Sequence, residues 1–297
     1  MSDRLKGKVA VVTGAGRGIG RGEALALASE GARVIVNDLG CAIDGSDTSS
    51  SPANDVVAEI KKRGGEAVAN YDSVATFQGG ENIVKTAVDT FGQLDILVNN
   101  AGIRPRKKIW DMTEDVWDAM IKTHLYGHFF TTRHACILFR QQRSGRIINT
   151  SSESGLGNIL GTVDYSAAKE GIIGFTRQLA RDMAEYGVTC NAIRPGGGTR
   201  MIDNTVRAIL EEAGRPSVWE SAKQLNPDDV GPLVVWLASD DAANVNGRTF
   251  LVYTGRISLY SEPVEWKTLV KDGSWTIDEM FNFMPSTLAA GLKSARK

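Results

Sequence analysis

The fold is decided by the stretch Val9-Ala10-Val11-Val12-Thr13-Gly14-Ala15-Gly16-Arg17-Gly18-Ile19-Gly20. Its four leading apolar residues are too few for a helix and are typical of a buried parallel strand. A helical run follows the glycine-rich turn, and residues 33–38 form a second strand. In such a strand–turn–helix–strand unit, the glycines let a pyrophosphate approach the backbone and the helix start offers it free N–H groups. The stretch therefore predicts a dinucleotide-binding turn.

The alternation of strand and helix continues along the chain. Further short apolar runs occupy residues 67–72, 94–98, 145–150, 188–193 and 248–253, with helical runs between them. Right-handed crossovers place helices on both faces of a parallel sheet, so we expect an α/β fold, a Rossmann-type doubly wound parallel sheet. Ligands bind such a sheet at the carboxyl ends of its strands.

A C-terminal extension follows the last of these strands. Residues 256–297 carry large apolar side chains, among them Trp266, Trp275 and Phe281, and are too apolar for a disordered tag. We expect this segment to be partly helical over residues 275–292. We also expect it to pack on the body of the protein or on a neighbouring subunit.

Composition excludes several classes of protein. The chain has 297 residues, 42% of them hydrophobic and 23% charged, and a net charge of −1, as in an ordinary globular protein without a nucleic-acid partner. Cys41, Cys136 and Cys190 are widely spaced and predict neither a metal site nor a disulfide framework. The polar N-terminus and the short apolar runs predict no signal peptide and no membrane span, so we expect a cytoplasmic protein.

Tyr165 and Lys169 stand four residues apart at the start of a run with helical periodicity. They are therefore expected one turn apart on the same helix face. An ammonium beside a phenol lowers the phenol pKa from its usual value of about 10, which suits an acid/base catalyst. The alternative interpretation is a surface pair on an amphipathic helix.

Asp38 ends the second strand, where a carboxylate can accept hydrogen bonds from both hydroxyls of an adenosine ribose. The same charge repels the 2′-phosphate of NADP, so Asp38 predicts NAD as the cofactor. Arg17, inside the glycine turn, is a cation that favours a phosphate, so this residue argues for NADP instead of NAD.

Five motifs occur in one order over roughly residues 5 to 255: Thr13-Gly14-Ala15-Gly16-Arg17-Gly18-Ile19-Gly20, Asn99-Asn100-Ala101-Gly102, Ser152, Tyr165-Ser166-Ala167-Ala168-Lys169 and Pro195-Gly196. Together they resemble the short-chain dehydrogenase/reductase family. The resemblance implies an NAD-binding catalytic domain over residues 1–255. It also implies an oxidoreductase that interconverts a secondary alcohol and a ketone.

The resemblance also implies the roles of the site residues. Tyr165 takes the hydroxyl proton, Ser152 orients the substrate oxygen, and Lys169 binds the nicotinamide ribose and lowers the pKa of Tyr165. With Tyr165 and Lys169, the residues expected to bind the cofactor are Gly14, Arg17, Gly18, Ile19, Gly20, Asp38, Asp72, Ser73, Asn100, Ala101, Gly102, Thr150, Pro195, Gly196 and Gly198.

His124 departs from the family pattern, because most members carry an asparagine there to hold a proton-relaying water. The resemblance places His124 among the catalytic residues, where it holds that water or relays protons itself near neutral pH. The alternative is a histidine packed within a helix.

A narrower resemblance is to the dehydrogenase part of the peroxisomal multifunctional enzyme and its bacterial relatives. It rests on Val36-Asn37-Asp38-Leu39-Gly40, Ala69-Asn70-Tyr71-Asp72-Ser73-Val74 and Thr123-His124-Leu125. The resemblance implies a 3-hydroxyacyl-CoA substrate or a 17β-hydroxysteroid. A CoA thioester needs cations for its phosphates, and Arg104, Arg106, Lys107 and Lys108 follow the Asn99 motif, although they could equally form a solvated loop.

Other readings remain open. A steroid or alicyclic alcohol needs only an apolar pocket, for which Leu156, Ile159, Leu160 and Met201 are available. An NADPH-dependent ketoreductase is opposed by Asp38, and an NAD-sensing binding protein is opposed by the intact Ser152, Tyr165 and Lys169. The family resemblance further implies a homodimer or homotetramer, formed through the helices that carry His124 and Tyr165.

Overall fold

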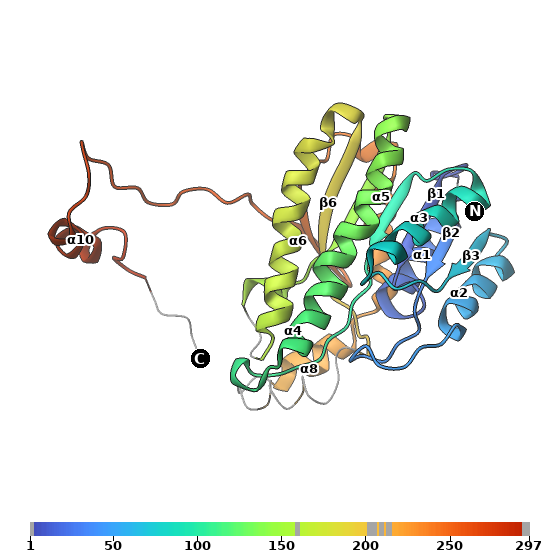
Figure 1. The fold of residues 1–297 in the computed structure, drawn as a ribbon, viewed down its shortest axis with the longest axis horizontal. Coiled ribbons are helices and arrows are strands. Elements are labelled where there is room, and N and C mark those ends of the chain that lie inside the picture. The colour runs from blue at the N-terminus through green and yellow to red at the C-terminus, as the bar shows by residue number, and fades with distance from the viewer. Residues whose placement is uncertain (1–2, 158–160, 201–206, 208–210, 212–215, 293–297) are drawn as a thin grey trace. The chain divides into compact units, whose positions relative to one another are not determined.

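The computed structural model describes residues 3–157, 161–200, 207, 211 and 216–292 (Figure 1). Its strands form one sheet in the order β3-β2-β1-β4-β5-β6-β7-β8. The strands are parallel from β3 to β7, and β8 pairs with β7 in the antiparallel sense. The bounds are β1 Val9–Thr13, β2 Arg33–Asn37, β3 Ala67–Asn70, β4 Ile96–Asn99, β5 Gly145–Thr150, β6 Val188–Pro195, β7 Thr249–Tyr253 and β8 Arg256–Leu259. The predicted Rossmann-type fold is confirmed.

Helices connect the parallel strands, and a further helix, α10, follows the last strand. Their bounds are α1 Gly18–Ser29, α2 Ser51–Lys62, α3 Phe77–Phe91, α4 Glu114–Ile121, α5 Gly127–Gln142, α6 Val163–Asp182, α8 Pro216–Lys223, α9 Gly231–Ala238 and α10 Ile277–Phe283. A π-helical turn, Lys122–Tyr126, joins α4 to α5. Short 3₁₀ turns lie at Ile109–Asp111, Glu153–Leu156, Ala184–Tyr186, Pro227–Val230, Asp240–Ala242 and Met284–Ser286. Among the described residues, none of these helices is long and apolar enough to cross a lipid bilayer.

The core lies in two layers, one on each face of the sheet. Ala10 and Val12 of β1 belong to a buried cluster with apolar residues of α1, α2 and α9. Val9 and Val11, which point to the opposite face, belong to a second cluster with residues of α3, α5 and α6. A strand buried on both faces needs apolar residues at every position, which is why its sequence is a continuous apolar run.

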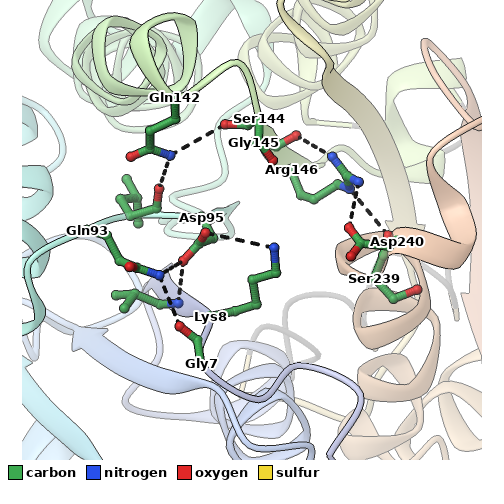
Figure 2. Close-up of polar contacts among 12 residues, drawn as sticks. Gly7, Lys8, Gln93, Asp95, Gln142, Ser144, Gly145, Arg146, Ser239 and Asp240 are labelled. Atoms are coloured by element: carbon green, nitrogen blue, oxygen red, sulfur yellow. Dashed lines mark hydrogen bonds and ion pairs between the residues drawn. The ribbon is translucent and has the colours of Figure 1, made fainter.

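Polar side chains tie the strand starts together at the edge of the sheet opposite the carboxyl ends (Figure 2). The Asp95 carboxylate accepts hydrogen bonds from the Val9 N–H at 2.8 Å and from the Gln93 amide at 2.6 Å. Next to it, the Arg146 guanidinium donates to the Asp240 carboxylate at 3.0 Å. The Asp95 contacts link β1 to the start of β4, and the Arg146 contact links β5 to the turn after α9, so this edge is fixed by side chains as well as by the strand ladder.

Strand β8 was not predicted from the sequence. Tyr253 pairs with Arg256, and Gly255 between them has a positive φ of 72°. A two-residue hairpin turn requires such a backbone conformation, which glycine adopts without strain. The dipeptide Thr254-Gly255 was therefore the available signal for a hairpin, and the strand lies within the segment that the sequence analysis assigned to the extension.

The chain divides into two compact units, Met1–Tyr260 and Ser261–Lys297. In the second unit, Thr276 and Glu279 form a reciprocal capping box at the start of α10. The Lys271 ammonium donates to the Glu279 carboxylate at 2.6 Å, and the rings of Trp275 and Phe283 meet edge to face at 6.1 Å. The described part of this segment therefore has internal structure and is partly helical, as expected.

Candidate active site

One cavity of about 1230 Å³ is lined by every catalytic and cofactor-binding residue that the sequence analysis selected. These residues come from the segments that follow β1, β2, β3, β4, β5 and β6, together with α6 and the π-helical turn. Parallel strands deliver their carboxyl ends to one edge, so residues far apart in sequence meet there. The structure brings the candidate residues together, and their individual roles stay predictions.

The glycine-rich turn is packed too closely for side chains. A Cβ atom on Gly14 would lie 2.7 Å from the Ala101 Cα, and one on Gly20 would lie 2.4 Å from the Gly14 carbonyl oxygen. The Asn100 amide fixes this turn by donating to the carbonyl oxygens of Thr13 at 3.0 Å and Gly14 at 3.1 Å. The turn is therefore held against the β4 loop, and its backbone faces the cavity as a dinucleotide cradle requires.

Asp38 is held by two backbone donors at the end of β2. Its carboxylate accepts from the Gly16 N–H at 2.7 Å and from the Gly40 N–H at 2.6 Å. A Cβ atom on Gly16 would lie 2.7 Å from this carboxylate, so glycine is required for the close approach. The carboxylate therefore has a defined position beside the glycine turn, where the adenosine ribose of a dinucleotide is expected.

Asp72 is fixed in a similar way after β3. Its carboxylate accepts from the Asn70 side chain at 2.8 Å and from the Asn82 side chain at 2.8 Å. With the adjacent Ser73 it lines the same cavity as Asp38. The position suits the predicted contact with the adenine end of a cofactor.

Tyr165 is 7% exposed, and two cations lie over its ring. The Lys169 ammonium is 5.5 Å from the ring centroid, and the Arg104 guanidinium carbon is 4.7 Å from it. Burial raises the pKa of Tyr165, but these two cations and a hydrogen bond from Ser152 outweigh it and lower the pKa below its usual value. A tyrosine in this setting can release and take up a proton.

Lys169 is buried beneath Tyr165 on the next turn of α6. Its ammonium donates to the Thr150 carbonyl oxygen at 2.6 Å, which fixes the side chain between α6 and the end of β5. Burial lowers the pKa of Lys169, and the nearby Tyr165 acts in the opposite direction. The pair predicted from its spacing is therefore buried and is not a surface pair.

Ser152 and its neighbour Ser151 have different surroundings at the end of β5. The Ser151 hydroxyl donates to the Lys169 carbonyl oxygen at 2.7 Å and so links the end of β5 to the backbone of α6. Both serines line the cavity, but the Ser152 hydroxyl bonds to the Tyr165 side chain, and its oxygen accepts from the Ser154 N–H at 3.1 Å. Ser152 is therefore the one of the two that can reach a substrate oxygen beside Tyr165.

His124 lies in the π-helical turn, fully buried, with its ring edge to face with Tyr165 at a centroid distance of 5.2 Å. Its Nε2 lies 2.7 Å from the Ile103 carbonyl oxygen and 3.2 Å from the Ile103 backbone nitrogen. We assign the proton to Nε2, because a carbonyl oxygen can only accept and the contact with it is the shorter of the two. Burial, followed by the Lys169 charge, lowers the pKa of His124 well below 6.5. The imidazole therefore stays neutral at pH 7. Its pKa is too low for His124 to relay protons by gaining and losing a charge near neutral pH.

Arg104 is the neighbour of Tyr165 that the sequence analysis did not place among the catalytic residues. It was considered for substrate phosphates or as part of a solvated loop, yet its guanidinium stacks on the Tyr165 ring and donates to the Ser154 hydroxyl at 3.4 Å. Its position after the Asn99 motif predicts that Arg104 lies at the carboxyl edge of the sheet. The sequence does not predict that its side chain points toward Tyr165.

The apolar residues considered for a steroid pocket are only partly described. Leu156 is 56% exposed. Ile159, Leu160 and Met201 lie outside the described residues.

Comparison with known proteins identifies the family. Residues 8–208 match the short chain dehydrogenase family. The chain belongs to this family. It is 44% identical over 254 residues to peroxisomal multifunctional enzyme type 2 of Mus musculus, covering 86% of this chain and 32% of that protein. It is 40% identical over 286 residues to a hydroxyacyl-CoA dehydrogenase of Mycobacterium tuberculosis, covering 93% of this chain and 87% of that protein.

A solved structure extends the likeness over the length of the chain. The crystal structure of a short chain dehydrogenase from Mycobacterium avium superposes with a TM-score of 0.81 at 40% identity and covers 99% of this chain and 97% of that chain. The predicted resemblance to this family, and within it to the dehydrogenase part of the multifunctional enzyme, is confirmed. As a short-chain dehydrogenase/reductase, the protein is an oxidoreductase. It spans about a third of the length of the multifunctional enzyme.

The residues present fit a nicotinamide dinucleotide. Gly14, Gly18 and Gly20 of the glycine turn line the cavity, and the Asp38 carboxylate is fixed beside this turn. The Thr150 hydroxyl is buried in the cavity wall without a partner among the described residues. Among the same residues, no group of three or more His, Cys, Asp or Glu side chains could hold a metal ion.

Proposed function

We propose that this protein is an NAD-dependent dehydrogenase that interconverts a secondary alcohol and a ketone, with 3-hydroxyacyl-CoA thioesters as substrates. The observation that carries the proposal is the convergence of Ser152, Tyr165 and Lys169 with Asp38 in one cavity. A binding protein that only senses the cofactor needs the Asp38 end of this cavity. It has no need for a buried tyrosine with a lowered pKa.

Asp38 supports NAD over NADP. Its carboxylate is held beside the Gly16 N–H, and a 2′-phosphate on the ribose would meet this charge at short range. Arg17 lines the same cavity and is the cation that would attract such a phosphate. NADPH-dependent reduction of a ketone is therefore the second candidate, and the cofactor assay below separates the two.

In the proposed mechanism, a bound nicotinamide supplies the hydride acceptor. Tyr165, as the phenolate, accepts the proton of the substrate hydroxyl, and Ser152 hydrogen-bonds the same oxygen to orient it. Lys169 stabilises the phenolate through its charge, since its ammonium lies 5.5 Å from the ring centroid. In the reverse direction, the phenol of Tyr165 donates the proton to the ketone oxygen.

His124 is proposed as a positioning residue. Because Nε2 donates to Ile103, the other ring nitrogen, Nδ1, is an acceptor, and it has no partner among the described residues. An acceptor buried near Lys169 suits a water that passes protons from the lysine to solvent. The neutral imidazole holds the water, and the lysine supplies the proton.

The substrate class rests on the relatives. One is named a hydroxyacyl-CoA dehydrogenase and another a multifunctional enzyme whose length this chain covers only in part. A steroid or alicyclic alcohol is the alternative substrate within the same reaction. The two differ in that a CoA thioester carries phosphates far from the reacting carbon.

The test is a set of initial rates with NAD and NADP on 3-hydroxyacyl-CoA thioesters, a 17β-hydroxysteroid and an alicyclic alcohol. We expect NAD-dependent turnover of the thioesters. Turnover of the free alcohols alone would contradict the substrate assignment, and preference for NADP would contradict the cofactor. Binding of NAD with no turnover of any substrate would favour the sensor.

We also propose a homodimer or homotetramer. Tyr126, Phe129 and Ile137 are exposed aromatic or aliphatic side chains along the π-helical turn and α5, and Val163 is exposed at the start of α6. Burial of such side chains between subunits would stabilise an assembly. A measured mass of one chain in solution would contradict it. The cytoplasmic location stays a prediction from the sequence.

A further inference from the structure

A second hollow, of about 510 Å³, adjoins the catalytic cavity and has a positive lining. Its walls are Ala42, Ile43, Asp44, Arg104, Pro105, Arg106 and Arg200. Three of the seven residues are arginines, and Asp44 is the one acid. Arg104, Arg200 and Asp44 also line the catalytic cavity, so the two spaces meet at these side chains.

Three loops from the carboxyl edge of the sheet build this hollow. The Arg104 N–H donates to the Ile43 carbonyl oxygen at 2.8 Å, which joins the loop after β4 to the loop after β2. The Arg200 guanidinium donates to the Cys41 carbonyl oxygen at 2.9 Å, which joins the loop after β6 to the same segment. Contacts with the backbone of the loop after β2 therefore bring Arg104 and Arg200 to the same hollow.

The acid in the hollow is bound to its own loop. The Asp44 carboxylate accepts from the Ser46 N–H at 2.9 Å and from the Ser46 hydroxyl at 2.7 Å, and these hydrogen bonds lower its pKa. The Nε of Arg104 is buried and has no hydrogen-bond partner among the described residues. The lining thus combines a net positive charge with an unused donor.

The structure also separates the cations of the segment after β4. Arg104 and Arg106 are partly buried in the hollow, whereas Lys107 and Lys108 are exposed, and Lys108 lies over the Trp110 ring at 5.6 Å. A guanidinium presents a planar fork of donors that matches two oxygens of a phosphate, which an ammonium cannot do.

We propose that this hollow is a phosphate-binding site for a substrate that carries phosphate groups at the far end from its reacting hydroxyl, as a CoA thioester does. The inference rests on the proposed function for the position of the reacting end. A phosphate could also come from the ribose of NADP. The carboxylate of Asp38, fixed between Gly16 and Gly40, makes the substrate the favoured source.

The test measures binding of CoA and of pantetheine, which has no phosphate, to the full-length protein saturated with NAD, by isothermal titration calorimetry. We expect CoA to bind and pantetheine to bind at least tenfold more weakly. Arg106→Gln and Arg200→Gln should each weaken CoA binding about tenfold, since each removes a charge-assisted contact. Lys107→Gln, which removes the same charge from the neighbouring exposed position, should change it less than twofold.

Absence of CoA binding, or equal affinity for CoA and pantetheine, would overturn the inference. So would an equal effect of all three substitutions. If the arginine variants weaken NADP binding but leave CoA binding unchanged, the phosphate belongs to the cofactor and the assignment to the substrate is wrong.

A kinetic comparison separates failure of this inference from failure of the proposed function. It compares a 3-hydroxyacyl-CoA with the N-acetylcysteamine thioester of the same acyl group, which lacks the phosphates. We expect a higher KM for the truncated thioester in the wild type and a smaller difference in Arg106→Gln. If both thioesters are oxidised with equal KM, the result supports the proposed dehydrogenase function and contradicts the phosphate-binding site. If CoA binds through the arginines but no thioester is oxidised, the result supports the phosphate-binding site and contradicts the proposed function.

Discussion

Two buried acids on two helices have pKa values shifted in opposite directions. Glu23 of α1 is fully buried, neither carboxylate oxygen has a hydrogen-bond partner among the described residues, and burial raises its pKa from 4.5 to about 8. Tyr165 of α6 is also buried, yet its pKa is lowered because Lys169 and Arg104 lie over its ring. The same desolvation acts on both groups.

The comparison shows what the catalytic site adds to ordinary burial. An acid placed in the core holds its proton, since the charged form loses its hydration. Tyr165 escapes this outcome through one cation from its own helix and one from the segment after β4. In the proposed mechanism, proton transfer therefore depends on the neighbours of Tyr165 as much as on Tyr165 itself.

The largest expected effect comes from removing the acid. Tyr165→Phe keeps the ring and its packing but deletes the hydroxyl that transfers the proton. We expect kcat to fall by roughly 10²–10⁴-fold, the usual loss for a positioned acid/base group. NAD affinity, measured by fluorescence titration, should stay within a few-fold. Near-full activity of this variant would contradict the mechanism.

Glu23 predicts a pH-dependent stability. A raised carboxyl pKa favours the folded state fully below the unfolded value of 4.5, and this contribution is lost as pH rises toward the folded value of about 8. Between pH 5 and pH 8 the loss amounts to about 4 kcal/mol at 1.36 kcal/mol per unit. Glu23→Met should remove this slope. Urea unfolding at both pH values measures it, and an unchanged slope in the variant would assign it to other groups.

Lys169 tests the cation that lowers the pKa of Tyr165 most. Lys169→Met removes one of the cations that oppose the effect of burial on Tyr165. The pKa of Tyr165 should therefore rise, and activity should require a more alkaline pH. We expect a loss of roughly 10–100-fold in kcat/KM at pH 7, as for loss of a close charge partner. Lys169→Arg, which keeps the charge, is the matched control for the pH profile. Equal profiles for both variants would mean that charge is not what lowers the tyrosine pKa.

Arg104 should have the smallest effect. Arg104→Gln removes the second cation while Lys169 remains, so the alkaline shift of the kcat/KM profile should be in the same direction as for Lys169→Met but smaller. The Lys107→Gln variant controls for a general change of charge on this segment. A shift of the same size in both variants would contradict a specific contact with Tyr165.

The sequence allowed the sheet and most of the site to be predicted because their signals are local. The glycine turn follows directly from β1, Asp38 ends β2, and Tyr165 and Lys169 are separated by one helical turn. In each case a spacing of a few residues determines the geometry. The two-layer core follows from the same periodicities.

What escaped prediction depends on contacts between distant segments. The stacking of Arg104 on Tyr165 requires the path of the β4 loop, and the neutral state of His124 depends on its burial and on the Ile103 carbonyl oxygen. The π-helical turn around His124 has no pattern in a single sequence. Strand β8 was missed because a four-residue strand after a Thr-Gly turn is a weak signal beside a long extension.

The two backbone hydrogen bonds to Asp38 have a consequence for how cofactor choice can change over evolutionary time. A side chain held at both oxygens has a single conformation before any ligand arrives, so binding requires no loss of its rotational freedom. By the same argument, it cannot swing aside to admit a larger group. Acceptance of a ribose phosphate here would need replacement of the residue, and with it loss of the contacts that close the Gly16 and Gly40 turns.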